Sequence, residues 1–218
     1  MASWSAENAT KAYLTTLKMG QKAKEPDVAE FISALAAGNN AQLMVVACAG
    51  AADSTTLALV AAAHQTGGRV VCILRGLQEL HLSQEVLGLD ACHVEFVIGE
   101  AQKQVLTQYR DADFVLLDCN LENHGGILKA LQVVRKQRDV VVVGYNAFCK
   151  ESWWSGGSRT QLLPIGEGLL LTRIAANAKS AVSGCGIGKS HWVVKVDKFT
   201  GEEHVFRVRF PQGKVIEA

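Results

Sequence analysis

The sequence lacks the features that mark membrane, secreted and nucleic-acid-binding proteins. It has 22 Lys and Arg against 21 Asp and Glu, a net charge of +1, whereas an electrostatic nucleic-acid binder carries a large basic excess. No apolar run approaches the roughly 20 residues that cross a bilayer, and the longest covers residues 43–52. The N-terminus has no basic segment followed by an apolar one, so no signal peptide is apparent. We therefore expect a cytoplasmic protein that binds neither nucleic acid nor membrane.

Closely spaced cysteines are also absent. The six cysteines are scattered and none forms a CxxC pair, which gives a zinc site little support. Reduced, buried cysteines in a cytosolic protein are the simpler interpretation. What the chain does have is 49% hydrophobic residues in 218, enough for a substantial core in one α/β domain.

The middle of the chain alternates between strand and helix patterns. Apolar runs typical of buried strands cover residues 43–48, 69–74, 93–98, 113–118 and 139–144. Helical spacing is found at residues 7–20, 26–37, 54–64, 78–87, 101–109 and 125–136. Strands that are apolar on both faces, with helices between them, predict a doubly wound, mostly parallel α/β sheet. Any ligand crevice then lies at the C-terminal strand ends.

The C-terminal part predicts hairpins in place of this alternation. Residues 160–174 contain two short strand patterns around a Gly-rich turn, which is typical of an antiparallel hairpin. Residues 175–190 are rich in Ala, Ser, Gly and Lys and predict a flexible linker. Residues 191–218 contain a second hairpin pattern. We therefore divide the chain into a main domain at residues 1–174, this linker and a C-terminal extension.

Four segments carry family motifs. They are LPIGEGLLLTR at residues 163–173, DFVLLDCNLENH at 113–124, VGYNA at 143–147, and the turn Gly99-Glu100-Ala101. In this order they resemble class I S-adenosylmethionine-dependent methyltransferases of the caffeoyl-coenzyme A and catechol O-methyltransferase type. The resemblance implies a Rossmann-like methyltransferase fold with S-adenosylmethionine as its cofactor. The opening MASWSAENATKAYL resembles a plant-specific family of methyltransferase-like sequences.

The cofactor loop that this resemblance implies is degenerate. The family pattern is an acidic residue followed by GxGxG, whose glycines let backbone N–H groups approach a ligand. Here only Gly50 of the three glycines remains, with Cys48 and Ala52 at the other positions. Asp53 and Ser54 come next, and two interpretations of them stay open. They contact the cofactor, or one of them caps the helix that begins there.

The other cofactor positions also depart from the family. The second strand of such proteins ends in a carboxylate that accepts hydrogen bonds from the ribose hydroxyls, and this chain has Arg75 there. An arginine suits a phosphate or carboxylate, or it is a solvated surface residue. Gly99 and Asp118 complete the candidate cofactor surface.

The metal and catalytic positions are degenerate as well. The catechol-type enzymes hold a divalent cation with two aspartates and an asparagine. Asp118 matches the first ligand, but Asn146 and Ala147 occupy the other two positions, and Leu121 replaces the lysine that assists deprotonation. We therefore expect no metal. His124 could act as a general base, or it is a solvated residue of the first helical turn. Asp118, His124 and Asn146 are the candidate catalytic residues.

Three functional interpretations stay open. In the first, a methyltransferase-like protein has lost classical catalysis and binds a small molecule or a protein partner. In the second, the chain is a divergent, metal-independent methyltransferase that uses S-adenosylmethionine and acts by proximity and orientation. In the third, Arg75 holds an anionic ligand for other chemistry. Trp153 and Trp154 could line a pocket or pack internally, and they or the C-terminal hairpin could form a homodimer interface.

Overall fold

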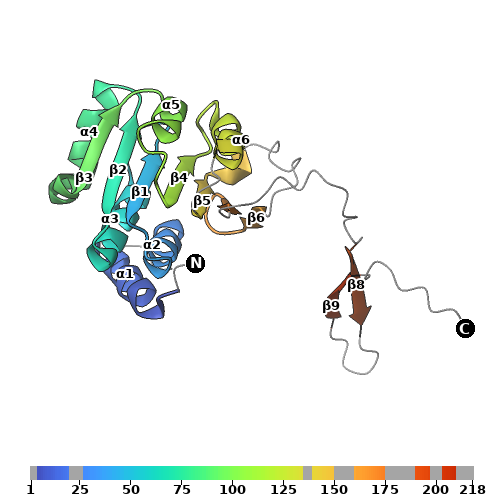
Figure 1. The fold of residues 1–218 in the computed structure, drawn as a ribbon. Helices are drawn as coiled ribbons and strands as arrows, with labels where there is room; N and C mark the ends of the chain where they lie inside the picture. The colour runs from blue at the N-terminus through green and yellow to red at the C-terminus, as the bar shows by residue number, and fades with distance from the viewer. Residues whose placement is uncertain are drawn as a thin grey trace, which may run out of the picture. The chain divides into compact units, whose positions relative to one another are not determined.

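The five apolar strand segments pair into one parallel array. The strands are β1 (Leu43–Ala47), β2 (Arg69–Leu74), β3 (Val94–Ile98), β4 (Phe114–Asp118) and β5 (Val140–Tyr145). An antiparallel hairpin, β6 (Thr160–Leu163) and β7 (Leu169–Ile174), continues the sheet, because β7 pairs with β5. The resulting order is β3-β2-β1-β4-β5-β7-β6 (Figure 1). This confirms the predicted doubly wound, mostly parallel sheet with its closing hairpin.

The computed structural model describes residues 4–19, 27–134, 139–149, 160–174, 190–196 and 203–209. They belong to two units, Met1–Ala178 and Lys179–Ala218. The second unit contains the other predicted hairpin, β8 (Ser190–Val196) paired antiparallel with β9 (Glu203–Arg209). Nearly all of the predicted linker, and the Trp153-Trp154 pair, lie outside the described residues. The division of the chain at residues 174 and 190 stays a prediction.

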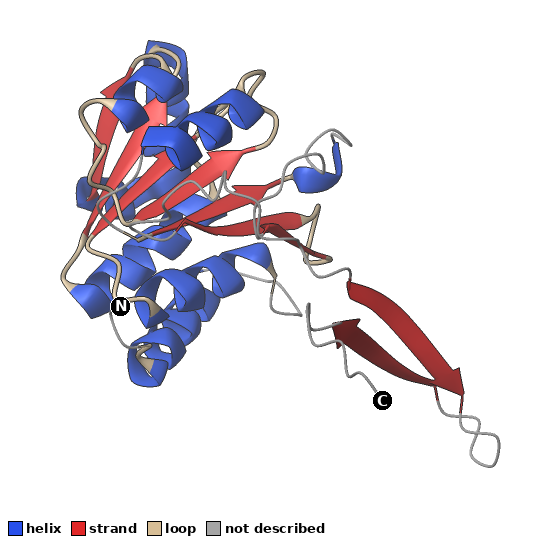
Figure 2. Ribbon diagram, turned by 45° about the vertical axis from the view of Figure 1, so that its right-hand side comes forward, coloured by secondary structure: helices blue, strands red, loops and turns tan. Residues whose placement is uncertain are grey.

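Both faces of the sheet are covered by helices, as Figure 2 shows. Along β1, Met44 and Val46 belong to one buried cluster, while Val45 and Ala47 belong to another on the opposite face. The first cluster packs under α1 (Ala6–Met19), α2 (Val28–Gly38), α3 (Ser54–Thr66) and α4 (Leu77–Leu87). The second packs under α5 (Ala101–Leu106) and α6 (His124–Val134). The period-two alternation of two apolar faces therefore produces a three-layer domain.

The predicted helix at residues 101–109 is too long. The structure ends α5 at Leu106, because Tyr109 turns into the core and its hydroxyl donates to Glu95 Oε1 on β3 at 2.7 Å. A 3₁₀ helix, η1 (Gly88–His93), also joins α4 to β3, and no sequence pattern indicated it. The other boundaries differ from the predicted ones by up to two residues.

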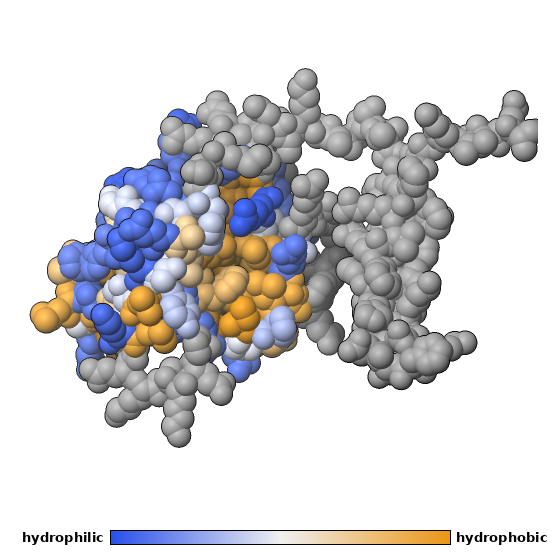
Figure 3. All heavy atoms as spheres, turned by 90° about the horizontal axis from the view of Figure 1, so that it is seen from below, coloured by the Kyte–Doolittle hydropathy of each residue, from blue (hydrophilic) through white to orange (hydrophobic). Residues whose placement is uncertain are grey.

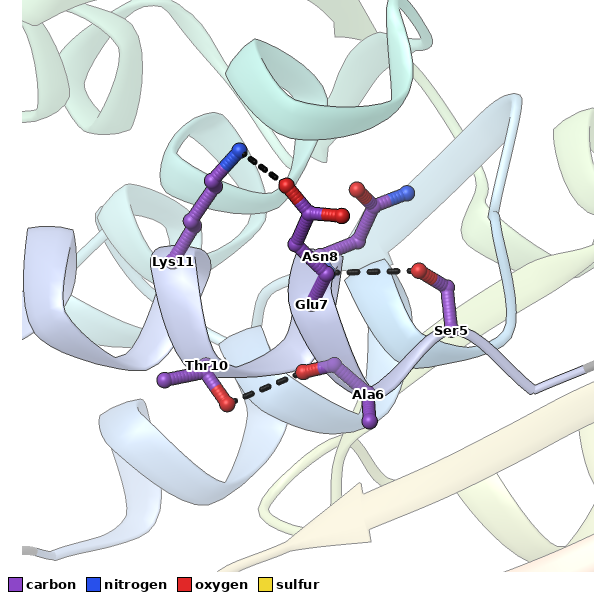
Figure 4. Close-up of polar contacts among 6 residues, drawn as sticks. All are labelled: Ser5, Ala6, Glu7, Asn8, Thr10 and Lys11. Atoms are coloured by element: carbon purple, nitrogen blue, oxygen red, sulfur yellow. Dashed lines mark hydrogen bonds and ion pairs between the residues drawn. The ribbon is translucent and has the colours of Figure 1, made fainter.

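The N-terminal helix is fixed by its first residues. Ser5 Oγ accepts from the backbone N–H of Asn8 at 3.2 Å, and Lys11 Nζ pairs with Glu7 Oε1 at 2.6 Å (Figure 4). The Ser5 N–H donates to the Gly38 carbonyl at 2.8 Å, at the end of α2. This last contact joins the start of α1 to the end of α2.

The surface of the described part mixes polar and apolar residues, and hydrophobic ones gather on the face seen in Figure 3. Large exposed apolar side chains occur on α4 and η1, namely Leu77, Leu82, Val86 and Leu89. No helix among the described residues has the length and apolarity to cross a membrane.

Candidate functional site

The loops after three neighbouring strands meet at one edge of the sheet. Leu74 at the end of β2 is paired with Ile98 of β3, so the residues that follow them, Arg75 and Gly99, are neighbours. The Gly99 N–H donates to the Leu74 carbonyl at 3.0 Å, and the Cys48 N–H after β1 donates to Ile73 at 3.2 Å. The strand order reverses between β1 and β4, which is the point where open α/β sheets bind ligands.

A pocket of about 230 Å³ opens at this edge. It is smaller than the roughly 300–1,000 Å³ of sites for drug-sized ligands, so it suits a small molecule. Its lining combines strand ends with the start of α5, the loop before α6 and the first turn of α6. The residues are Cys48, Ile73, Leu74, Arg75, Gly99, Glu100, Ala101, Gln102, Leu121, Glu122, Asn123 and Ile127.

Two of the six predicted cofactor residues, Arg75 and Gly99, line this pocket. These two residues therefore lie at the strand ends, where the sequence predicted a ligand crevice. Gln102 and Ile127 also line it, and neither stood out in the sequence. They lie on helices, where a polar or apolar residue carries no signal for a site until the fold is known.

Asp118, at the end of β4, is a buried hydrogen-bond acceptor outside the pocket lining. Its carboxylate Oδ1 accepts from the Asn120 N–H at 2.9 Å and from Asn146 Nδ2 at 3.1 Å, and Oδ2 accepts from the Ala49 N–H at 3.2 Å. Only 7% of the residue is exposed. The carboxylate therefore joins the loops after β1, β4 and β5.

These contacts fit a divalent cation poorly. Hard cations need several oxygen ligands, preferably anionic. Asn146 directs its amide N–H₂ at Asp118, and Ala147 offers only a methyl group. Leu121 is buried at the position where the catechol-type enzymes have a lysine. Among the described residues no three His, Cys, Asp or Glu side chains gather as a metal site. The chemistry of this set of side chains therefore does not match that of the metal-dependent enzymes.

The cofactor loop after β1 is only partly suited to a ligand. A Cβ placed on Gly50 would meet nothing within 4 Å, so space for a ligand exists beside it. Asp53 is occupied as the N-cap of α3, where its Oδ1 accepts from the Thr55 N–H at 2.9 Å and from Thr55 Oγ1 at 2.6 Å. Ser54 is the exposed first residue of that helix. The capping interpretation is confirmed for Asp53, and a cofactor contact by either residue stays a prediction.

His124 is buried, which corrects one of its two interpretations. Its exposed fraction is 5%, and Nδ1 contacts the Leu121 carbonyl, so it is not a solvated residue of the helix start. A carbonyl only accepts hydrogen bonds, so the Nδ1 in this contact carries the proton. His124 does not line the pocket. Its role as a general base stays a prediction.

A buried group of polar side chains lies behind the pocket. Cys48 Sγ on its wall is 3.7 Å from Cys72 Sγ on β2. The contact with Cys48, followed by burial, raises the pKa of the Cys72 thiol far above its ordinary value. Burial, and then electrostatic interaction with the nearby Cys48, Asp53 and Asp118 side chains, raises the pKa of Tyr145 well above its ordinary value. The Cys72 thiol and the Tyr145 hydroxyl are therefore neutral at pH 7, and Cys72 is not a nucleophile.

The strand order and the ligand edge define a Rossmann-like methyltransferase fold, and solved structures agree. A methyltransferase from Geobacter sulfurreducens superposes with a TM-score of 0.55 and 19% identity, covering 79% of this chain and 91% of that one. An O-methyltransferase from Bacillus cereus in complex with SAH gives 0.50 and 12%, covering 78% and 91%. The O-methyltransferase TomG from Streptomyces achromogenes, in complex with SAM, gives 0.50 and 15%, covering 81% and 92%. At such identities these similarities establish the fold alone.

The chain belongs to the family described as protein of unknown function DUF1442, whose model matches residues 1–208. No curated protein is significantly similar to it in sequence. The match spans both units of the chain.

Proposed function

We propose that this chain is a small-molecule-binding protein on a methyltransferase scaffold, with a nucleoside-type ligand in the pocket at the ends of β2, β3 and β4. We further propose that it does not carry out metal-assisted O-methylation. One observation carries this second part: the Asp118 carboxylate receives three hydrogen bonds, one of them from the amide that replaces a second aspartate. A side chain so engaged is a structural connector between loops.

The pocket supports the binding role. Its apolar residues include Ile73, Leu121 and Ile127, which suit the face of a ring, while Gln102 and Asn123 offer amide groups for hydrogen bonding. Cys48, on the same wall, contacts the buried Cys72 thiol, whose raised pKa leaves it without a charge at pH 7. Ligand binding needs only such apolar and amide groups, whereas catalysis would also need an activated side chain.

An active, metal-independent methyltransferase is the second candidate, and the space beside Gly50 favours it. Two of the solved neighbours are complexes with SAH or SAM. Should S-adenosylmethionine bind here, Gly50, Gly99 and Asp118 are the positions that would face it. The cofactor would supply the methyl group, and the residues would orient it against an acceptor.

Thermal unfolding of the purified chain tests the proposal. Adenosine at a hundred times its dissociation constant stabilises by about 2.7 kcal/mol, which raises the melting temperature by roughly 5–10 °C. We expect such a shift with adenosine, no larger shift with S-adenosylmethionine or S-adenosylhomocysteine, and no methyl transfer to catechol with Mg²⁺. Ala101→Trp, which fills the pocket, should abolish the shift, whereas Leu89→Trp at a 93% exposed position should not.

A larger shift with the methionine-containing ligands, together with transfer of a methyl group, would favour the second candidate. The absence of a shift with every adenosine compound would refute the binding proposal itself.

A further inference from the structure

Arg75 carries a positive charge into the pocket without an ion-pair partner among the described residues. The ion pairs of that part of the chain join Lys11 to Glu7 and Arg69 to Glu95. Arg75 is exposed, follows the last residue of β2 and lines the pocket with Ile73, two residues before it. The guanidinium is therefore available to a ligand.

The position of Arg75 in the fold decides which ligand atoms it meets. In dinucleotide-binding α/β sheets the residue at the end of the second strand faces the ribose, where a carboxylate accepts from the hydroxyls and an arginine accommodates a phosphate. A guanidinium has five N–H donors and no acceptor, so it cannot accept from ribose hydroxyls. It matches a phosphate with two parallel hydrogen bonds.

The rest of the lining limits where an anion can lie. Glu100 and Glu122 place carboxylates in the same pocket, and these repel a phosphate and accept from amino or hydroxyl groups. Asn123 Nδ2 donates to Gln102 Oε1, which closes the wall between α5 and the loop before α6. At about 230 Å³ the pocket accepts a base with its sugar, and an extended dinucleotide would project from it.

We propose that the pocket binds an adenosine monophosphate whose phosphate is on a ribose 2′- or 3′-hydroxyl, with that phosphate held by Arg75. This inference rests on the proposed nucleoside site and assigns its ligand class. Arg75 gives the neutral ribose of S-adenosylmethionine no acceptor for its hydroxyl groups, which the acid of the family pattern would supply.

Calorimetric titration of the full chain tests the inference with five probes: adenosine, its 2′-, 3′- and 5′-monophosphates, and inorganic phosphate. We expect the 2′- or the 3′-monophosphate to bind about tenfold to a hundredfold more tightly than adenosine, as for hydrogen bonds to a charged group. The 5′-monophosphate has the same charge in another position and should show no such gain. Arg75→Gln should remove the gain, so that this variant binds the monophosphates no more tightly than it binds adenosine.

Two further variants sharpen the test. Arg75→Glu restores an acceptor, so it should bind adenosine more tightly than the wild type does and reject the monophosphates. Arg173→Gln removes an exposed arginine on β7, outside the pocket lining, and should change nothing.

The outcomes separate the two proposals. Equal affinity for adenosine and its monophosphates, or a phosphate preference that survives in Arg75→Gln, overturns the phosphate assignment and leaves the nucleoside site standing. Inorganic phosphate that binds as tightly as the nucleotides overturns the nucleotide assignment in favour of a simple anion site. Failure of adenosine and all its monophosphates to bind overturns both the assignment and the proposed function.

Discussion

At the residue scale, the same amino acid has different chemistry according to its neighbours. Asp118 matches the first metal ligand of the resembled family, yet here its Oδ1 faces the Asn146 amide at 3.1 Å. Asn146 adopts a positive φ of 57°, a conformation that Asn and Asp tolerate better than other side chains. A carboxylate at residue 146 would fit this backbone but would stand beside Asp118 with the same charge.

Asn146→Asp is therefore expected to lower the free energy of unfolding by about 1–3 kcal/mol in EDTA, because a hydrogen bond becomes a repulsion between carboxylates. Mg²⁺ should restore part of the loss, since two carboxylates form a better oxygen site. Urea unfolding with EDTA or Mg²⁺ measures both effects. Asn40→Asp, at another positive φ of 54°, is the control. Stabilisation of the wild-type protein by Mg²⁺ would contradict the interpretation of Asp118 as a connector.

At the element scale, local rules account for the helix starts. The N-cap of α3 is Asp53, whose side chain accepts a hydrogen bond from the Thr55 N–H. Short polar side chains are typical at this position. At the start of α2, the Asp27 N–H donates to Glu30 Oε2 at 2.9 Å, a contact between residues three apart. Such contacts need no tertiary partner.

Asp53→Ala should accordingly destabilise the protein by about 1 kcal/mol, because it leaves N–H groups at the start of α3 without an acceptor. Asp53→Asn should retain most of the stability. Urea denaturation measures the change, with Asp111→Ala in the exposed turn after α5 as the control. If Asp53 also contacts a ligand, Asp53→Asn weakens adenosine binding. Unchanged binding in that variant would assign Asp53 to the cap alone.

At the scale of the whole molecule, side chains far apart in the sequence fix the edge of the sheet. Tyr109, after α5, donates to Glu95 on β3, and Glu95 pairs with Arg69 at the start of β2 at 3.3 Å. Burial, followed by the hydrogen bond to Glu95, raises the pKa of Tyr109 from its ordinary 10 to about 12.

Self-association of the chain stays a prediction.

This pKa predicts a loss of stability in alkali. The folded protein keeps the Tyr109 proton at a pH where the unfolded chain has released it, so the stabilising contribution is complete below pH 10 and is lost between pH 10 and about 12. Urea unfolding across this range should show Tyr109→Phe losing less stability than the wild type. Some loss should remain, because the pKa of Tyr145 is raised too. Tyr13→Phe on α1 serves as the control, and identical slopes for wild type and Tyr109→Phe would refute the prediction.

The sequence by itself determined the order and type of the α-helices and strands, and it indicated the edge of the sheet where the pocket opens. Apolar period, capping residues and Gly-rich turns act over a few positions, and parallel strands bring their C-terminal ends together whatever the loops contain. Arg75 and Gly99 could therefore be placed beside each other from their positions after β2 and β3.

Only the tertiary structure decided which side chains face one another inside that frame. The hydrogen bond from Asn146 to Asp118 joins residues 28 positions apart in the sequence, and the contact between Cys48 and Cys72 joins residues 24 positions apart. The burial of His124 and the early end of α5 likewise depend on neighbours from other elements. Burial and hydrogen bonding between distant segments are set by packing in three dimensions, and no local pattern in the chain encodes them.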